Sequence, residues 1–175
     1  FGSLKNAAEA TSNHGRLIDI HTHIEGNSVY LNCEYFTGDA AGQNMTTIAT
    51  EAMCRFALEN MPMQPVYWFL ESNFSGDKKA SSMSFLTVRG KKATAEVRIA
   101  RKMVEKDLHT DAETMVNFWR MSVLGSVMSG TIGAQGHYAN GLAALYLATG
   151  QDVACASESS VGITRLENLD GDLHA

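Results

Sequence analysis

Two short stretches of the chain carry side chains that could stabilise a developing negative charge. The first is Asp77-Lys78-Lys79, and the second is Gly150-Gln151-Asp152. A lysine ammonium can donate a hydrogen bond to an oxyanion, and a carboxylate beside it can orient the ammonium and keep it charged. Taken alone, however, two lysines beside an aspartate are more typical of a solvated surface loop.

A third stretch, Thr37 to Met45, places a glycine-containing turn before a helical pattern. The start of a helix offers backbone N–H groups and a positive dipole end, and both suit a phosphate-bearing ligand. The residues alone favour an ordinary capped helix, because short motifs of this kind often match by chance. His137 and Asn140 share a helical face, where a lone histidine is usually structural.

His21 and His23 alternate along a predicted strand, so they share a face and could suggest a metal site. No third ligand is evident, and we predict that no metal is bound. Cys33, Cys54 and Cys155 are odd in number and far apart in sequence, which favours reduced thiols in a cytosolic protein.

The composition excludes several classes of protein. A chain of 175 residues with 45% hydrophobic content can bury one core or two small ones, so it is globular. The net charge of -5 and the scattered basic residues argue against a nucleic-acid partner. No run reaches the roughly 18 apolar residues of a membrane span, so we expect a soluble, cytoplasmic segment without membrane contact. Because Phe1 is not an initiator methionine, we expect a piece of a longer protein.

The first part of the chain must position the Thr37–Met45 stretch. Alternating apolar residues between Arg16 and Phe36 predict two strands joined by a turn at residues 25–28. Apolar residues three and four apart from Met45 to Phe56 predict an amphipathic helix, with Asp39 as its N-cap and Gly42 in its first turn. The apolar run Val66 to Leu70 is typical of a buried strand.

The remaining elements position the lysine and aspartate motifs. The polar residues 71–82 predict a loop and a domain boundary, followed by strands near residues 84–88 and 94–99 and a turn at 89–91. Thr110 and Glu113 form a capping-box pattern that opens a helix towards Met128. A helix of small residues is predicted for residues 137–149, with Gly150 as its stop. Strands and helices do not alternate regularly, so the predicted fold class is α+β.

In this order and spacing, the three stretches, the glycines of residues 125–130 and His137-Tyr138-Ala139-Asn140 resemble the catalytic core of class I 3-hydroxy-3-methylglutaryl-coenzyme A (HMG-CoA) reductases. The resemblance implies a ferredoxin-like NAD(P)H-binding domain at residues 1–70, a catalytic lysine loop at 71–82 and part of a larger substrate domain at 83–175. It implies reduction of HMG-CoA to mevalonate and coenzyme A with two NADPH, in a homodimer or tetramer. The glycines of residues 125–130 have a packing explanation and are assigned no chemistry.

The resemblance also implies roles for single residues. Lys78 is the lysine that holds the oxyanion, and Asp152 tunes it. The residues expected at the substrate are Asn73, Asp77, Lys79, His137 and Asn140. The residues expected at the cofactor are Ser12, Asp39, Ala41, Gly42, Gln43 and Asn44. Asn13 stands where the family has an arginine beside Ser12, so NADH remains an alternative to NADPH.

Two residues depart from the family pattern. Glu71 stands where a serine is common, and Met121 stands where a lysine pairs with the substrate carboxylate. Either the neighbouring Arg120 substitutes for that lysine, or the substrate differs. The family's catalytic glutamate and histidine have no counterpart in these residues, so we expect the chain by itself to be inactive. The alternatives are a non-catalytic dinucleotide- or coenzyme A-binding module, and a structural fragment that keeps a dimer surface.

Overall fold

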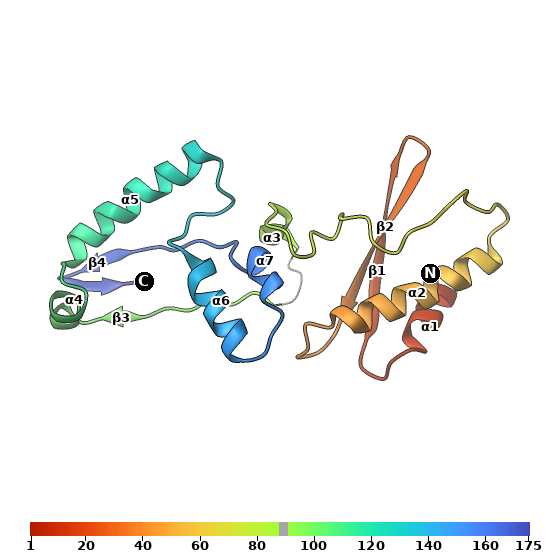
Figure 1. Ribbon diagram of the computed structural model, residues 1–175, viewed down its shortest axis with the longest axis horizontal. Helices are drawn as coiled ribbons and strands as arrows, with labels where there is room; N and C mark the ends of the chain where they lie inside the picture. Colours follow the sequence, from red (N-terminus) through yellow and green to blue (C-terminus); the bar gives the residue numbers. More distant parts are fainter. Residues whose placement is uncertain (88–90) are drawn as a thin grey trace. The chain divides into compact units, whose positions relative to one another are not determined.

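The computed structural model describes residues 1–87 and 91–175 (Figure 1). The described residues form two compact units. The first contains residues 1–75 and Lys91, and the second contains residues 76–87 and 92–175. Both units combine helices with small antiparallel sheets, as the α+β prediction requires. The predicted turn at residues 89–91 falls largely outside the described residues.

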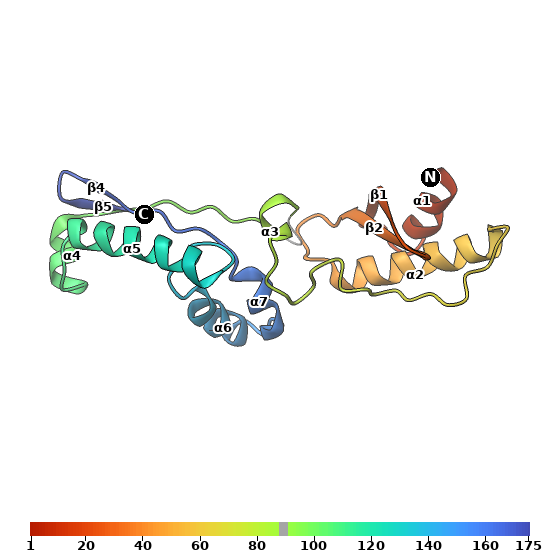
Figure 2. The same ribbon diagram turned by 90° about the horizontal axis from the view of Figure 1, so that it is seen from above.

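The first unit is a hairpin with two helices packed against it (Figures 1 and 2). Strands β1 (Arg16–Glu25) and β2 (Ser28–Phe36) pair antiparallel, which confirms the predicted hairpin. The pairing ends at Glu25 opposite Ser28, because Gly26 takes a left-handed φ of 56° in the two-residue turn. Helices α1 (Gly2–Glu9) and α2 (Gln43–Asn60) close a core formed by Ala8, Leu17, Ala49 and Met53.

Two predictions in the first unit are wrong. Gly42, and not Asp39, is the N-cap of α2, because its left-handed φ of 77° turns the chain into the helix three residues later than predicted. The run Val66–Leu70 forms no strand; Val66 is 97% exposed and Phe69 is 76% exposed. A strand needs a partner for its N–H and C=O groups, and no neighbouring strand among the described residues supplies one.

The second unit is built on a three-stranded antiparallel sheet with the order β3-β5-β4. Its strands are short: β3 (Arg98–Ile99), β4 (Glu167–Leu169) and β5 (Asp172–His174). Helices α4 (Arg101–Asp107) and α5 (Ala112–Ser129) cover the sheet, and Figures 1 and 2 show α5 lying beside β4. The buried core of this unit consists of Val104, Ala112, Val116 and Leu173.

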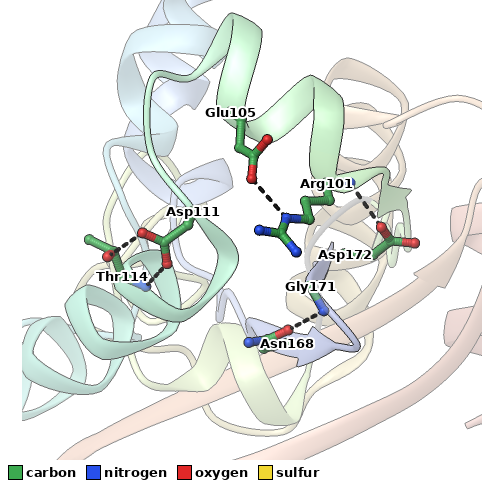
Figure 3. A network of polar contacts seen from close by, with 7 residues as sticks. All are labelled: Arg101, Glu105, Asp111, Thr114, Asn168, Gly171 and Asp172. Atoms are coloured by element: carbon green, nitrogen blue, oxygen red, sulfur yellow. Dashed lines mark hydrogen bonds and ion pairs between the residues drawn. The ribbon is translucent and has the colours of Figure 1, made fainter.

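Polar contacts fasten this sheet to its helices (Figure 3). The Asp172 carboxylate accepts hydrogen bonds from Arg98 Nε and from the Arg101 N–H, both at 2.8 Å. Arg101 Nε also donates to Glu105 at 2.7 Å. The N-cap of α5 is Asp111, whose Oδ1 accepts from the Thr114 N–H at 2.8 Å. The predicted cap, Thr110, is therefore wrong by one residue.

The two strands predicted after residue 82 are largely wrong. Residues Met83–Leu86 form the short helix α3, because their hydrogen bonds close within the segment, such as Thr87 N–H to Met83 O at 2.8 Å. Val88 lies outside the described residues. Of the strand predicted for 94–99, β3 pairs with β5, and the Val97 N–H and C=O also bond to Ala175 at 2.9 Å, while residues 94–96 form no strand. The predicted helix at residues 137–149 is confirmed as α6 (Tyr138–Ala148).

Candidate active site

The lysine motif lies in a tight turn at the start of the second unit. The Lys79 N–H donates to the Gly76 carbonyl at 3.0 Å and closes the turn. Lys78 lies inside the turn with a φ of 58°, in the left-handed region that side chains disfavour. A residue other than glycine keeps this conformation only where its surroundings hold it, and such residues gather at functional sites. The contacts of this turn therefore hold Lys78 in a conformation that it shares with Asn73, His109, His137 and Asp170 among the described non-glycine residues.

The aspartate motif is set by the end of α6. The Gln151 N–H donates to Tyr146 O at 2.8 Å and the Gly150 N–H donates to Leu147 O at 3.4 Å, with Gly150 left-handed at φ 68°. This pair of bonds is a Schellman motif, which ends the helix at the predicted glycine. The chain then reverses, and the Asp152 carboxylate accepts from the Ala154 N–H at 3.0 Å.

The structure brings Lys78 and Asp152 together. Lys78 Nζ lies 2.8 Å from Asp152 Oδ2, within the second unit. The two side chains are 44% and 46% exposed, so the pair is open to solvent in this chain and not buried. The hydrogen bond that Lys78 donates to Asp152 raises the pKa of Lys78. The same bond, helped by the Ala154 N–H, lowers the pKa of Asp152. Both groups are consequently charged at neutral pH.

A second carboxylate contacts the same lysine. Helix α7 (Ala156–Ser159) follows the 3-10 turn η1 (Val153–Cys155), and Glu158 in α7 accepts a hydrogen bond from the Lys78 backbone N–H at 3.0 Å. Sequence reasoning did not find Glu158. A carboxylate on a short polar helix looks like a solvated surface residue, and only the fold brings it to a partner 80 positions away.

The arrangement favours one kind of chemistry. A lysine that acts as a nucleophile or general base must lose its proton near neutral pH, which desolvation or a neighbouring cation promotes. Lys78 has the opposite environment, because Asp152 favours its charged form. The ammonium is therefore suited to donating hydrogen bonds to an oxygen that becomes negative.

The other residues expected at the substrate are partly placed beside this pair. Asp77 and Lys79 flank Lys78 in the turn, and Lys79 Nζ donates to Asp77 O at 3.0 Å. His137 is the N-cap of α6 with a left-handed φ of 57°, and the Asn140 N–H donates to its carbonyl at 3.1 Å. Within the described residues, no hydrogen bond joins His137 or Asn140 to Lys78.

Asn73 belongs to the first unit and also has a left-handed φ, 63°. Its N–H donates to the Glu71 carboxylate, which also accepts from Ser75 Oγ at 3.4 Å. The Glu71 carboxylate thus accepts hydrogen bonds from residues of its own loop. On α5, Arg120 Nη1 donates to Asn117 Oδ1 at 3.0 Å, and Met121 is 72% exposed.

The residues expected at the cofactor all lie in the first unit. Asp39, Ala41, Gly42, Gln43 and Asn44 surround the start of α2. A Cβ on Gly42 would fall 2.4 Å from the Thr37 side chain, so a larger residue here requires Thr37 to shift. The hydroxyl of Ser12 accepts from the His14 N–H at 3.1 Å and closes the turn after α1.

Comparison with known proteins identifies the family. The family model described as hydroxymethylglutaryl-coenzyme A reductase matches residues 1–175. The chain belongs to this family. It is 43% identical to the 3-hydroxy-3-methylglutaryl-coenzyme A reductase of Haloferax volcanii over 175 residues, which cover 99% of this chain and 43% of that protein. The reductase of Methanocaldococcus jannaschii is 38% identical over 99% of this chain and 44% of its own length.

A eukaryotic reductase is also similar. The 3-hydroxy-3-methylglutaryl-coenzyme A reductase 2 of Dictyostelium discoideum is 38% identical over 98% of this chain and 33% of its own length. The chain therefore spans less than half the length of these reductases.

Among the residues that the structure describes, no helix is long and apolar enough to cross a membrane.

Proposed function

We propose that this chain forms the part of an HMG-CoA reductase that holds the electrophilic lysine, and that the enzyme reduces HMG-CoA to mevalonate and coenzyme A with two NADPH. The observation that carries the proposal is the 2.8 Å contact between Lys78 Nζ and Asp152 Oδ2. Membership of the reductase family supports the substrate.

The reaction explains why a permanently charged lysine is needed. Reducing a thioester to an alcohol takes two hydride additions at one carbon. The first gives a hemithioacetal oxyanion, which expels the coenzyme A thiolate and re-forms a carbonyl as the aldehyde; the second hydride and a proton give the alcohol. Each addition moves negative charge to the same oxygen. Lys78 donates a hydrogen bond to that oxygen in both steps. Asp152 orients the ammonium and keeps it protonated, as its effect on the Lys78 pKa supports. One such preorganised donor typically contributes a factor of about 100 to 1000 to kcat.

The residues beside Lys78 bind the rest of the substrate in this proposal. Lys79 faces the carboxylate of the hydroxymethylglutaryl group, and Asp77 and Asn73 support the loop. His137 and Asn140, one turn apart at the start of α6, contact the acyl group. With Met121 at the position of the family's lysine, Arg120 is the cation available on α5.

The start of α2 is the proposed cofactor site. Gly42 makes the left-handed turn into α2, with the Thr37 side chain packed where a Cβ would lie, and the first turn of this 18-residue helix presents backbone N–H groups and a positive dipole end. Asp39, Ala41, Gln43 and Asn44 would line the dinucleotide, and Ser12 would contact the 2′-phosphate of NADPH. When bound, the nicotinamide supplies the hydride. NADH is the alternative.

Further parts of the proposal concern the whole protein. We propose a ferredoxin-like arrangement for the complete small domain, a homodimer or tetramer, and a cytoplasmic active site. The exposed apolar side chains of α5 are of the kind that the rest of the protein or a second subunit normally covers. They are Phe118, Met121, Leu124, Val127 and Met128.

The test is Lys78→Ala in the complete enzyme. NADPH oxidation that depends on HMG-CoA should fall by about 100-fold or more, while NADPH still binds, as followed by nicotinamide fluorescence. Unchanged turnover in Lys78→Ala would exclude the role of Lys78. Binding of NADPH without any turnover in the wild-type protein would instead support a non-catalytic binding module.

A further inference from the structure

One short segment holds Lys78 at two points. Asp152 contacts the side-chain ammonium at 2.8 Å, and Glu158, six residues later, accepts from the backbone N–H at 3.0 Å. The first contact acts on the charge of the lysine. The second contact acts on the backbone of the lysine. The role proposed for Asp152 does not explain this second contact.

The backbone contact matters because Lys78 is left-handed. The N–H of residue 78 belongs to the peptide plane before its Cα, and the N–H of residue 79 belongs to the plane after it. Glu158 holds the first plane, and the Gly76 carbonyl holds the second through the 3.0 Å turn bond. Together they maintain the φ of 58° at Lys78. A change to the usual negative φ would redirect the Cα–Cβ bond and carry the ammonium away from Asp152.

Glu158 lies in the same short segment as Asp152, and this segment is bonded to α6 at both ends. Next to Glu158, Ser159 Oγ accepts from the hydroxyl of Tyr146 on α6 at 2.8 Å. The Schellman motif at Gly150 fixes the other end of the same segment. Glu158, which holds the backbone of Lys78, and Asp152, which holds its ammonium, therefore lie in the same short segment.

We propose that Glu158 is a positioning residue that holds the left-handed backbone of Lys78, so that the ammonium meets both Asp152 and the substrate oxygen. The proposal rests on the proposed function. A carboxylate is a stronger acceptor than a neutral group, which suits a bond that must maintain an unfavourable backbone conformation.

The test compares Glu158→Ala and Glu158→Gln in the complete enzyme. Glu158→Ala should lower kcat by about 10- to 100-fold with KM for HMG-CoA and NADPH within about twofold, because misplacing a reacting group by about 1 Å costs up to 100-fold. Glu158→Gln keeps an oxygen acceptor and should recover most of kcat. Glu105→Ala is the matched control, since Glu105 is an exposed, arginine-paired carboxylate of the same unit; its kcat should be unchanged.

A second readout does not depend on catalysis. Hydrogen exchange at the Lys78 amide should be slow in the wild-type enzyme and about tenfold or more faster in Glu158→Ala. An unprotected Lys78 amide in the wild-type enzyme would overturn the proposal whether or not the variants fold. Equal kcat in Glu158→Ala and wild type, or equal loss in the Ala and Gln variants, would also overturn it. If Lys78→Ala itself keeps full activity, the proposed function fails instead.

Discussion

Replacing Gly42 by alanine tests whether the turn before α2 requires a glycine. Alanine in the left-handed region costs about 1–2 kcal/mol relative to glycine. Its Cβ would also lie 2.4 Å from Thr37 Cγ2, and Thr37 Oγ1 donates to Ala40 O at 2.7 Å, so moving this side chain loses a hydrogen bond worth about 1 kcal/mol. The sum is about 2–3 kcal/mol.

For a unit of this size, about 4–8 °C of Tm accompanies each kcal/mol, so the transition of the first unit should fall by roughly 10–20 °C. Scanning calorimetry of the complete enzyme measures this change, and titration with NADPH measures the expected loss of affinity. Gly38→Ala is the matched control, since Gly38 has a φ of 64° but open space around its Cβ. Gly38→Ala should lose only the stability that the left-handed backbone costs, without the steric contribution. Equal Tm values for the two variants would refute the steric argument, and unchanged NADPH affinity in Gly42→Ala would refute the cofactor site.

Two further predictions concern ionisable groups. The Arg101 N–H and the Arg98 guanidinium lower the pKa of Asp172, so its stabilising effect is complete above the unfolded pKa, about 3.8, and is lost as pH falls through the lower folded value. When the pH is lowered from about 5 to about 2.5, the free energy of unfolding should therefore fall less in Asp172→Asn than in the wild type. Denaturant titrations at the two pH values measure this fall, and an equal fall in both proteins would contradict the prediction. Burial, with Cys54 nearby, raises the pKa of Cys33 to about 11 from 9.0, so alkylation at about pH 8 should be about 100-fold slower than for an unstructured cysteine peptide. Peptide mass spectrometry measures both rates, and equal rates would show that the thiol is accessible.

The elements that sequence reasoning predicted correctly are those whose signals are local. The hairpin of residues 16–36 has alternating apolar residues and a glycine at its turn, and α2 and α6 have clear helical patterns. Gly150 ends α6 because a left-handed glycine lets the Gln151 N–H reach back to Tyr146. These features need no information about distant parts of the chain.

The failures occurred where a distant partner decides the structure. The apolar run Val66–Leu70 has the composition of a strand, but pairing depends on a neighbour that a single segment cannot reveal. Residues 94–99 alternate like a strand, yet in the part of the chain that the structure describes their backbone pairing begins at Val97, opposite Ala175, and continues through β3. The caps of α2 and α5 were misplaced by three residues and one residue, because several polar residues precede each helix and only the backbone shows which one caps it.

The same distinction applies to the candidate site. Lys78 and Asp152 could be paired from the sequence because each lies in a recognisable motif, and the resemblance linked the motifs. Glu158 has no motif of its own, and its contact depends on the orientation of a backbone N–H. The left-handed conformation of Lys78 was equally hidden, since lysine carries no signal for positive φ.

The pH dependence of kcat in Asp152→Asn, compared with the wild-type enzyme, tests the central claim most directly. Asparagine keeps the shape of aspartate but removes the charge that raises the pKa of Lys78. The alkaline limb of the kcat profile should therefore move to lower pH in the variant, as the ammonium loses its proton earlier. An alkaline limb at the same pH in both enzymes would contradict the account, because the catalytic charge would then not belong to the Lys78–Asp152 pair.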